Sequence, residues 1–142
     1  MNRIFAPPRG ELHRMKTPAL RAFADRIFSQ WIRLRYVDVQ SMKTRCFTCG
    51  RYDFWYKLEC GHFVPRANSC TRYHELNCHP QCKTCNGFMD GNLDVYAVNL
   101  DKKYGPGTAD RLRFLGRQMC KISRPELVDL ILETDKKIGI YL

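Results

Sequence analysis

The chain has 142 residues, of which 44% are hydrophobic and 27% are charged, and its formal net charge at pH 7 is +10. This length fits one domain with short extensions, and the hydrophobic content excludes wholesale disorder. So large a basic surplus favours a polyanionic partner, with nucleic acid as the leading candidate, although charge alone also fits a solvated basic surface without a ligand.

The first segment, residues 1–16, carries basic residues and two prolines but no apolar run long enough for a signal peptide. No later segment has the length and hydrophobicity needed to span a bilayer. We therefore expect a basic, flexible N-terminal segment, no membrane association, and a cytoplasmic protein whose thiols stay reduced.

The next segment, residues 17–41, predicts an amphipathic helix. Thr17-Pro18 is typical of an N-cap followed by proline at the first helical position. Apolar residues from Leu20 to Ile32 then recur at three- and four-residue steps, which gives one stripe that belongs to a core or to a subunit interface. Basic residues lie off this stripe and could contact phosphate or only water: Arg21, Arg26 and Arg33.

Two cysteine pairs, Cys46-x-x-Cys49 and Cys82-x-x-Cys85, have the spacing of zinc ligands. A tight turn aims both sulfurs of one pair at the same ion, and two pairs fill the four tetrahedral positions of Zn²⁺. Gly50 suits the left-handed turn that follows such a pair. The sequence therefore predicts a structural zinc site, with disulfides or packed thiols as the alternative.

The residues enclosed by the two pairs predict short strands. The aromatic run 52–58 is typical of a strand, 61–64 would be its antiparallel partner or a turn into it, and 76–81 would be a strand leading into the second pair. Helical patterns follow Asn86, ending at Gly105, and begin again at Thr108 and at the capping box 123–126. We expect a zinc-bound core over 42–105 and a helical extension over 106–142.

His62 lies between the two cysteine pairs and is a candidate general base. Histidine titrates close to neutral pH, so a neutral imidazole can take a proton from water beside a phosphodiester. Because four cysteines already complete the zinc site, His62 is not required as a zinc ligand and is available as a base. A structural role is the alternative.

Three polar residues around the second cysteine pair are further candidates. Asn86 could offer its side-chain oxygen to a hard cation such as Mg²⁺, or it could cap a helix. Asn77 and His79 share one face of the expected strand, so Asn77 would brace the His62 loop and His79 would be a second histidine near the ion. Asp90 lies four residues after Asn86 and is a carboxylate ligand or a turn residue.

Together these residues resemble a known family. The motifs Cys46-x-x-Cys49-Gly50 and Gly61-His62-Phe63, the run 72–86 and Gly91-Asn92-Leu93 resemble the NinG/Rap proteins of lambdoid bacteriophages, relatives of the HNH endonucleases and of phage endonuclease VII. The resemblance covers Cys46 to Tyr104. It implies an α+β fold with a small zinc-stapled ββα-metal, treble-clef-like core, flanked by an N-terminal helix and C-terminal helices.

The activity implied by the resemblance is that of a phage-encoded recombination endonuclease in the bacterial cytoplasm. Such a protein binds branched DNA, such as D-loops and Holliday junctions, and nicks it by Mg²⁺- or Mn²⁺-dependent hydrolysis. By this resemblance His62 is the general base, Asn86 a metal ligand and Asn77 the bracing residue. A two-fold junction would favour a homodimer. The candidate DNA contacts are Arg66, Arg72 and Lys83.

One position departs from the pattern of many HNH enzymes. They carry a metal-binding aspartate directly before the base histidine, where this chain has Gly61. Either His79, Asp90 or Glu59 supplies the missing ligand, or the site binds DNA and cuts poorly.

Three more cysteines, Cys60, Cys70 and Cys78, lie in the same region, with His74 nearby. They are buried or surface thiols, or they form a second zinc site. In the second case the protein would be a non-catalytic zinc-containing DNA-binding or adaptor module. Cys120 falls in a helical pattern, where we expect it to be packed.

Overall fold

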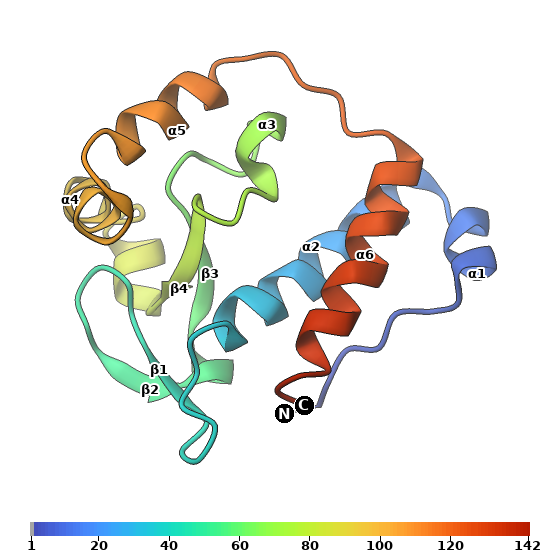
Figure 1. Ribbon diagram of the computed structural model, residues 1–142, viewed down its shortest axis with the longest axis horizontal. Coiled ribbons are helices and arrows are strands. Elements are labelled where there is room, and N and C mark those ends of the chain that lie inside the picture. Colours follow the sequence, from blue (N-terminus) through green and yellow to red (C-terminus); the bar gives the residue numbers. More distant parts are fainter. Residues whose placement is uncertain (1) are drawn as a thin grey trace.

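The structure, a computed structural model, describes residues 2–142 and confirms the mixed α+β class. Helices α2 and α6 lie side by side with α1 beyond them, the strands occupy the centre, and α4 and α5 lie on the far side (Figure 1). The elements are α1 (Arg9–Arg14), α2 (Thr17–Leu34), β1 (Lys43–Arg45), β2 (Tyr52–Phe54), β3 (Glu59–His62), α3 (Ser69–Arg72), β4 (Cys78–Gln81), α4 (Leu93–Tyr104), α5 (Thr108–Gly116) and α6 (Arg124–Ile138), with short helical turns at Trp55–Lys57 and Thr84–Phe88.

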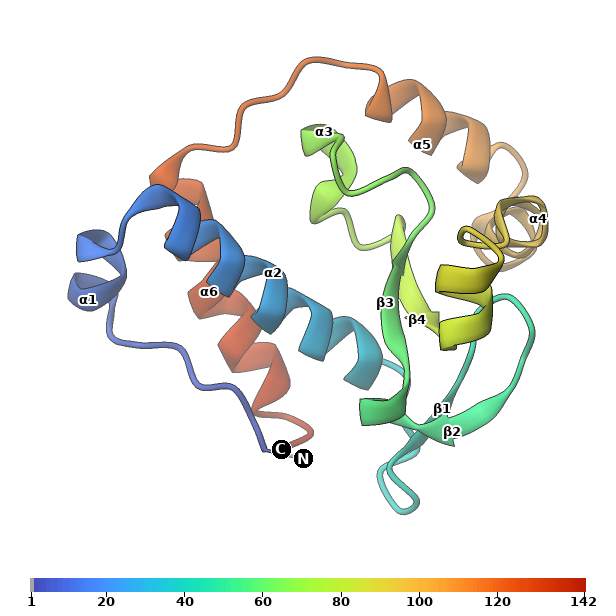
Figure 2. The same cartoon turned by 180° about the vertical axis from the view of Figure 1, so that it is seen from behind.

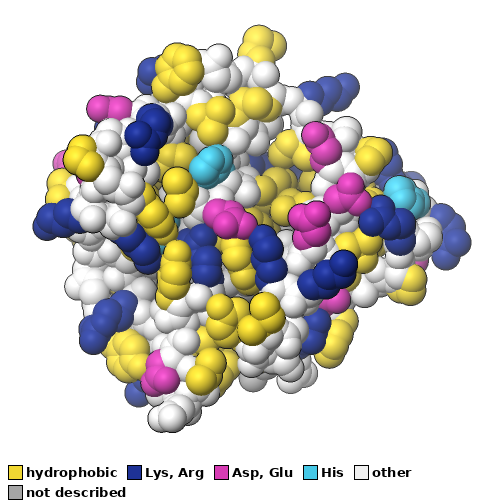
Figure 3. Space-filling view, in the orientation of Figure 1, with side chains coloured by type: hydrophobic (Ala, Val, Ile, Leu, Met, Phe, Trp, Pro, Cys, Tyr) yellow, Lys and Arg dark blue, Asp and Glu magenta, His cyan; other side chains and the backbone are white. Residues whose placement is uncertain are grey.

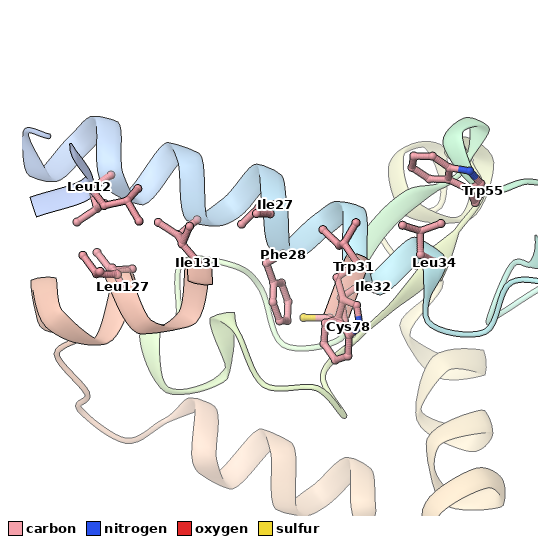
Figure 4. Close-up of a cluster of buried hydrophobic side chains, with 14 of the residues drawn as sticks. Leu12, Ile27, Phe28, Trp31, Ile32, Leu34, Trp55, Cys78, Leu127 and Ile131 are labelled. Carbon is pink, nitrogen blue, oxygen red and sulfur yellow. The ribbon is translucent and has the colours of Figure 1, made fainter. Parts of the chain in front are cut away.

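The apolar stripe of α2 forms the main core. It packs against α6 and α1, and Trp55 and Cys78 join it from the strand region (Figure 4). The stripe predicted from the sequence is therefore confirmed as core. The predicted N-cap at Thr17 is wrong by one residue: Thr17 is the first helical residue, and the N-cap is Lys16, whose side chain cannot accept a hydrogen bond from the backbone. The Thr17 hydroxyl accepts a hydrogen bond from Arg124.

Residues 2–16 are packed against the helices, contrary to the expectation of a flexible segment. Arg3 forms an ion pair of 2.9 Å with Asp135 of α6, and the Gln30 side chain of α2 accepts a hydrogen bond from the Ile4 backbone. Leu12 in α1 is fully buried in the core. Basic residues here act partly as structural partners of α2 and α6.

The strands form two antiparallel pairs, β1 with β2 and β3 with β4. The expected pairing of residues 61–64 with the aromatic run 52–58 is wrong. A 3-10 turn at Trp55–Lys57 ends β2 at Phe54, so β3 pairs with β4, with His62 opposite Cys78. This pairing brings the two ends of the loop 63–77 together.

The C-terminal helices follow the predicted order. At Ser123 the predicted capping box is present, with side chain and backbone of Ser123 and Glu126 bonded reciprocally. Helix α5 ends at Gly116, where an added Cβ would lie 2.6 Å from a Val64 methyl group. Cys120 lies beyond the helix and forms a disulfide with Cys70. The expectations that Cys120 packs inside a helix and that the thiols all stay reduced are therefore wrong, and Cys70 is neither a free thiol nor a zinc ligand.

The surface is mixed in charge. On the face drawn in Figure 3, lysine and arginine side chains are spread over several elements and alternate with acidic and hydrophobic ones. Within residues 2–142 no helix combines the length and the apolar character that a membrane crossing requires.

Candidate functional site

The four predicted zinc ligands converge. The sulfur atoms of the two pairs all lie within 4.8 Å of one another, and those of Cys49 and Cys82 are 3.8 Å apart. Sulfurs bound to Zn²⁺ at about 2.3 Å in a tetrahedron lie about 3.8 Å apart. Gly50 has a φ of 77°, the left-handed turn expected after the first pair. The cluster is thus positioned to hold a metal ion, as the sequence predicts.

The surroundings of this cluster favour the thiolate at one sulfur. Burial raises the pKa of Cys46, but hydrogen bonds from the Cys49 backbone and the Thr48 hydroxyl outweigh it and lower the pKa to about 6. Burial raises the pKa of Cys49 to about 12 and also raises that of Cys82, although the backbone N–H of Cys85 donates to the Cys82 sulfur over 3.4 Å. An ion that needs deprotonated sulfur would therefore displace protons from Cys49 and Cys82.

His62 ends β3 with its ring held in one orientation. Its Nε2 lies 3.0 Å from the carbonyl oxygen of Arg72. A carbonyl oxygen only accepts, so Nε2 carries the proton and the lone pair of Nδ1 is left to accept another. Burial lowers the pKa of His62, and the hydrogen bond to the Arg72 carbonyl opposes this only in part. The neutral ring is therefore the resting form at neutral pH.

Asn77 holds the loop that follows His62. Its side-chain oxygen accepts from the Val64 backbone over 2.8 Å, and its amide group donates to the carbonyls of Val64 and Thr71. Asn77 is fully buried, so water does not compete for these bonds. This placement is the bracing role expected from the sequence.

A cavity of about 400 Å³ brings together residues of four segments. His62 lines it from β3, Asn86 from the turn after Cys85, and Asp25 from α2. The exposed side chains of Arg66 and Asp90 also line it, so the cavity reaches the surface. The expected convergence of His62 and Asn86 is therefore present in the structure.

Asn86 has a carboxylate neighbour. Its amide nitrogen donates to Oε1 of Glu59 over 3.0 Å, which leaves its side-chain oxygen uncommitted. The two residues thus offer oxygen ligands side by side, the kind of donor that hard divalent cations prefer. Asp90 lies in a left-handed turn with a φ of 49°, because the helical turn carrying Asn86 ends at Phe88. It lines the cavity from that turn rather than from a regular helix.

The structure explains Gly61. A Cβ built at this position would lie 1.9 Å from the Gln81 side-chain oxygen, and Gln81 is fully buried. The Gln81 amide is fixed there by donating to the Gly91 carbonyl over 2.8 Å. The aspartate that many HNH enzymes carry before the base histidine has no room at this position.

His79 is not brought to the cavity, so the expectation that it binds the catalytic ion is corrected. The ring is fully buried, with Nδ1 3.0 Å from the Tyr96 hydroxyl and Nε2 2.8 Å from the Tyr104 hydroxyl. It also stacks on Phe47 at 3.9 Å between ring centroids. Both nitrogens are occupied, and burial lowers the pKa of His79 to about 2. His79 is a structural residue of the α4 interface.

The three expected DNA contacts have different environments. Arg66 is exposed beside the cavity, and Lys83 lies at a second hollow whose other basic residues include Arg51 and Lys57. Arg72 is committed to Asp25, with nitrogen to oxygen distances of 2.9 and 2.6 Å. This correction removes Arg72 as a free phosphate contact and makes it a support for the loop that holds His62.

Sequence reasoning missed Asp25. It lies on α2, far from the motif in the chain, and accepts hydrogen bonds from Arg72 and Tyr73. Burial raises its pKa, but the hydrogen bonds and the charge of Arg72 outweigh this and lower the pKa overall. In the sequence, Asp25 stands out only as an acidic residue next to the apolar stripe of α2.

The sequence model of the bacteriophage lambda NinG protein family matches residues 13–140. The chain belongs to the NinG family. Comparison with curated proteins and with solved structures gave no match. Membership in the NinG family suggests a function related to bacteriophage recombination and agrees with the resemblance seen in the sequence. The match includes α2, so the helix carrying Asp25 belongs to the NinG region.

Proposed function

We propose that this NinG protein is a metal-dependent endonuclease of phage recombination that binds and nicks branched DNA, with His62 as the general base. The observation that carries the proposal is the orientation of His62. Its Nε2 proton is held by the Arg72 carbonyl, its Nδ1 has no hydrogen-bond partner among residues 2–142, and its side chain lines a cavity that Asn86 shares. A fixed, neutral imidazole beside an oxygen-rich cation position is what hydrolysis of a phosphodiester needs.

The elements support the proposal by their order. Two antiparallel strands, β3 and β4, are followed by the helical turn that carries Asn86, and this order resembles the ββα-metal arrangement of HNH enzymes. The four-cysteine cluster would hold a structural Zn²⁺ that joins the turn before β2 to the turn after β4. The zinc supplies no chemistry of its own in this proposal because all four positions are taken by sulfur.

Asn86 and Asp90, which line the cavity with His62, would hold the catalytic Mg²⁺ or Mn²⁺. Glu59 lines the neighbouring hollow and would orient Asn86 by accepting its amide hydrogen bond. When bound, such an ion neutralises charge that builds on the phosphate. His62 would take the proton of the attacking water at Nδ1, while the Arg72 carbonyl keeps the ring from turning. Asn77 would hold the loop that supplies this carbonyl.

The basic residues near the cavity would hold the DNA backbone. Arg66 stands at the cavity, and Lys83 shares the neighbouring hollow with Glu59, whose backbone belongs to the same strand as His62. These positions let a strand approach His62 along a basic surface. A net charge of +10 adds attraction that carries no sequence preference.

The experiment compares a four-way junction with a linear duplex of the same sequence, each with Mg²⁺, with Mn²⁺ and with EDTA. The proposal predicts nicks near the branch point, only with a divalent ion, and faster on the junction. Salt-sensitive binding without strand scission under any divalent ion would contradict it and favour the non-catalytic DNA-binding or adaptor module.

A further inference from the structure

A second group of metal-ligating side chains lies on the opposite face of β3 from Gly61. The ligand atoms of Cys60, His62 and Cys78 all lie within 4.8 Å of one another. The strand pairing explains this, since His62 is opposite Cys78 and Cys60 is two residues before His62, so all three point to one face. This set differs from the group of cysteines considered from the sequence.

The two sulfurs of this group form no disulfide, although the Cys78 thiol donates a hydrogen bond to the Arg72 carbonyl over 3.6 Å, which a metal ion would replace. Cys70 is joined to Cys120, whereas Cys60 and Cys78 are free thiols. Cys78 is fully buried against the core, and in Figure 4 its sulfur points toward the ring of Phe28. Cys60 is half-buried and lines the same cavity as His62.

We propose that Cys60, His62 and Cys78 form a second metal site, selective for soft divalent ions such as Zn²⁺, whose occupation switches off His62 as a base. Two thiolates and one imidazole are a ligand set that zinc accepts and Mg²⁺ does not. Three protein ligands would leave one tetrahedral position open, and the cavity that Cys60 and His62 line has room for a further ligand. Water would complete the coordination there.

A metal ion on the His62 ring would prevent it from acting as a base, and this part of the proposal rests on the proposed nuclease function. The lone pair of Nδ1 is the one that the Arg72 hydrogen bond leaves free, and an ion bound to it takes the electrons that a proton would need. An ion bound to Nε2 instead would break the hydrogen bond to the Arg72 carbonyl and release the ring. In the first case His62 loses the free lone pair, and in the second case it loses the fixed ring orientation, that a general base requires.

Cobalt titration tests the site without any reference to activity. Metal-free protein is titrated with Co²⁺ in place of Zn²⁺, and the sulfur-to-cobalt absorption is followed. The wild type should take up two equivalents, the first with the spectrum of four thiolates and the second with that of two.

The variant Cys60→Ser should lose the second equivalent of Co²⁺ and keep the first. The double variant Cys70→Ser/Cys120→Ser, which removes two other sulfurs, should keep both. Saturation of the wild type at one equivalent, or a second equivalent retained in Cys60→Ser, would overturn the site.

Inhibition by added Zn²⁺ tests whether occupation of this second site prevents His62 from acting as a base. At fixed Mg²⁺, added Zn²⁺ should inhibit junction cleavage by the wild type, and Cys60→Ser should need about tenfold more Zn²⁺ or higher for the same inhibition. Equal inhibition of both proteins would overturn the blocking role even if the cobalt site is present. Should the wild type fail to cut any DNA, the nuclease proposal fails, and the cobalt titration still decides the site.

Discussion

The carbonyl oxygen of Arg72 lies 3.0 Å from Nε2 of His62, while the guanidinium of the same Arg72 is paired with Asp25 on α2. One residue therefore connects the main helix to the candidate base. Its backbone sets the tautomer of His62, and its side chain fixes where that backbone lies. Helix α2 thus contributes to the site although it carries none of the motif residues recognised in the sequence.

The first prediction concerns Asp25. Replacement by Asn removes the charge that Arg72 and Tyr73 are bonded to, and we expect a loss of about 2 kcal/mol in the free energy of unfolding. Because the folded pKa is lowered, this stabilisation is complete above the ordinary aspartate pKa and disappears as pH falls through the folded value. Urea unfolding at neutral pH measures the difference.

The control for Asp25 is Asp129→Asn, which removes the partner of Arg9 in an ion pair where both side chains are 56% exposed. An exposed pair contributes little, so this variant should unfold close to the wild type. Equal effects of the two substitutions would show that the Asp25 to Arg72 pair has no special structural role.

The second prediction concerns Gly61. Gly61→Ala should cost roughly 1–3 kcal/mol, because its Cβ meets the fixed Gln81 side chain, and Gly61→Asp should be no better. Introducing the aspartate that many HNH enzymes carry should therefore not raise the proposed nuclease activity. Gly87→Ala is the matched control, since an added Cβ there has nothing within 4 Å. A more active and equally stable Gly61→Asp protein would refute the steric explanation.

The third prediction is a pH dependence of stability due to His79. Its pKa falls from 6.5 in the unfolded chain to about 2 in the fold, because the ring is buried. The unfolded state binds one more proton over this range, so stability is complete above pH 6.5 and declines as pH falls toward the folded value. The slope attributable to this residue is about 1.4 kcal/mol per pH unit.

His79→Phe tests this slope. The aromatic ring keeps the stacking position on Phe47 but cannot take up a proton, so the stability of the variant should fall less steeply between pH 6.5 and 5 than that of the wild type. Denaturant midpoints at several pH values measure both slopes. Only the slopes are compared, because the variant also loses the two tyrosine hydrogen bonds. Parallel curves would show that His79 is not the titrating group.

The fourth prediction concerns the four-cysteine cluster. Chelation of the proposed Zn²⁺ should release the turn between β1 and β2 at Cys46 and the turn after β4 at Cys82, and should raise amide exchange in β3 and β4. Helices α2 and α6 should stay protected, since their contact is apolar. Hydrogen exchange before and after chelation makes the comparison. Uniform loss of protection in both regions would mean that the zinc supports the whole fold.

Much of the site could be predicted because its residues are close in sequence to rigid features. The spacing of each cysteine pair fixes the turn that orients its sulfurs, and Asn77 is two residues from a buried strand position. The capping box at Ser123 is likewise a local signal, and the structure contains it.

The remaining features depend on contacts between distant segments. Nothing near Asp25 in the sequence indicates that α2 will face Arg72, and the pairing of Cys70 with Cys120 spans 50 residues. His79 shares a strand face with Asn77, but that face is covered by Tyr96 of α4, which no local pattern reveals. Tertiary packing, rather than propensity, decided these positions.

The most direct measurement compares junction cleavage by wild type, His62→Ala and His13→Ala at matched zinc content and matched far-UV circular dichroism. His13 is an exposed histidine of α1, so its loss controls for removal of an imidazole. We expect His62→Ala to lower the cleavage rate by about a hundredfold or more, while His13→Ala cuts like the wild type. A folded His62→Ala protein that cuts the junction at the wild-type rate would exclude His62 as the general base.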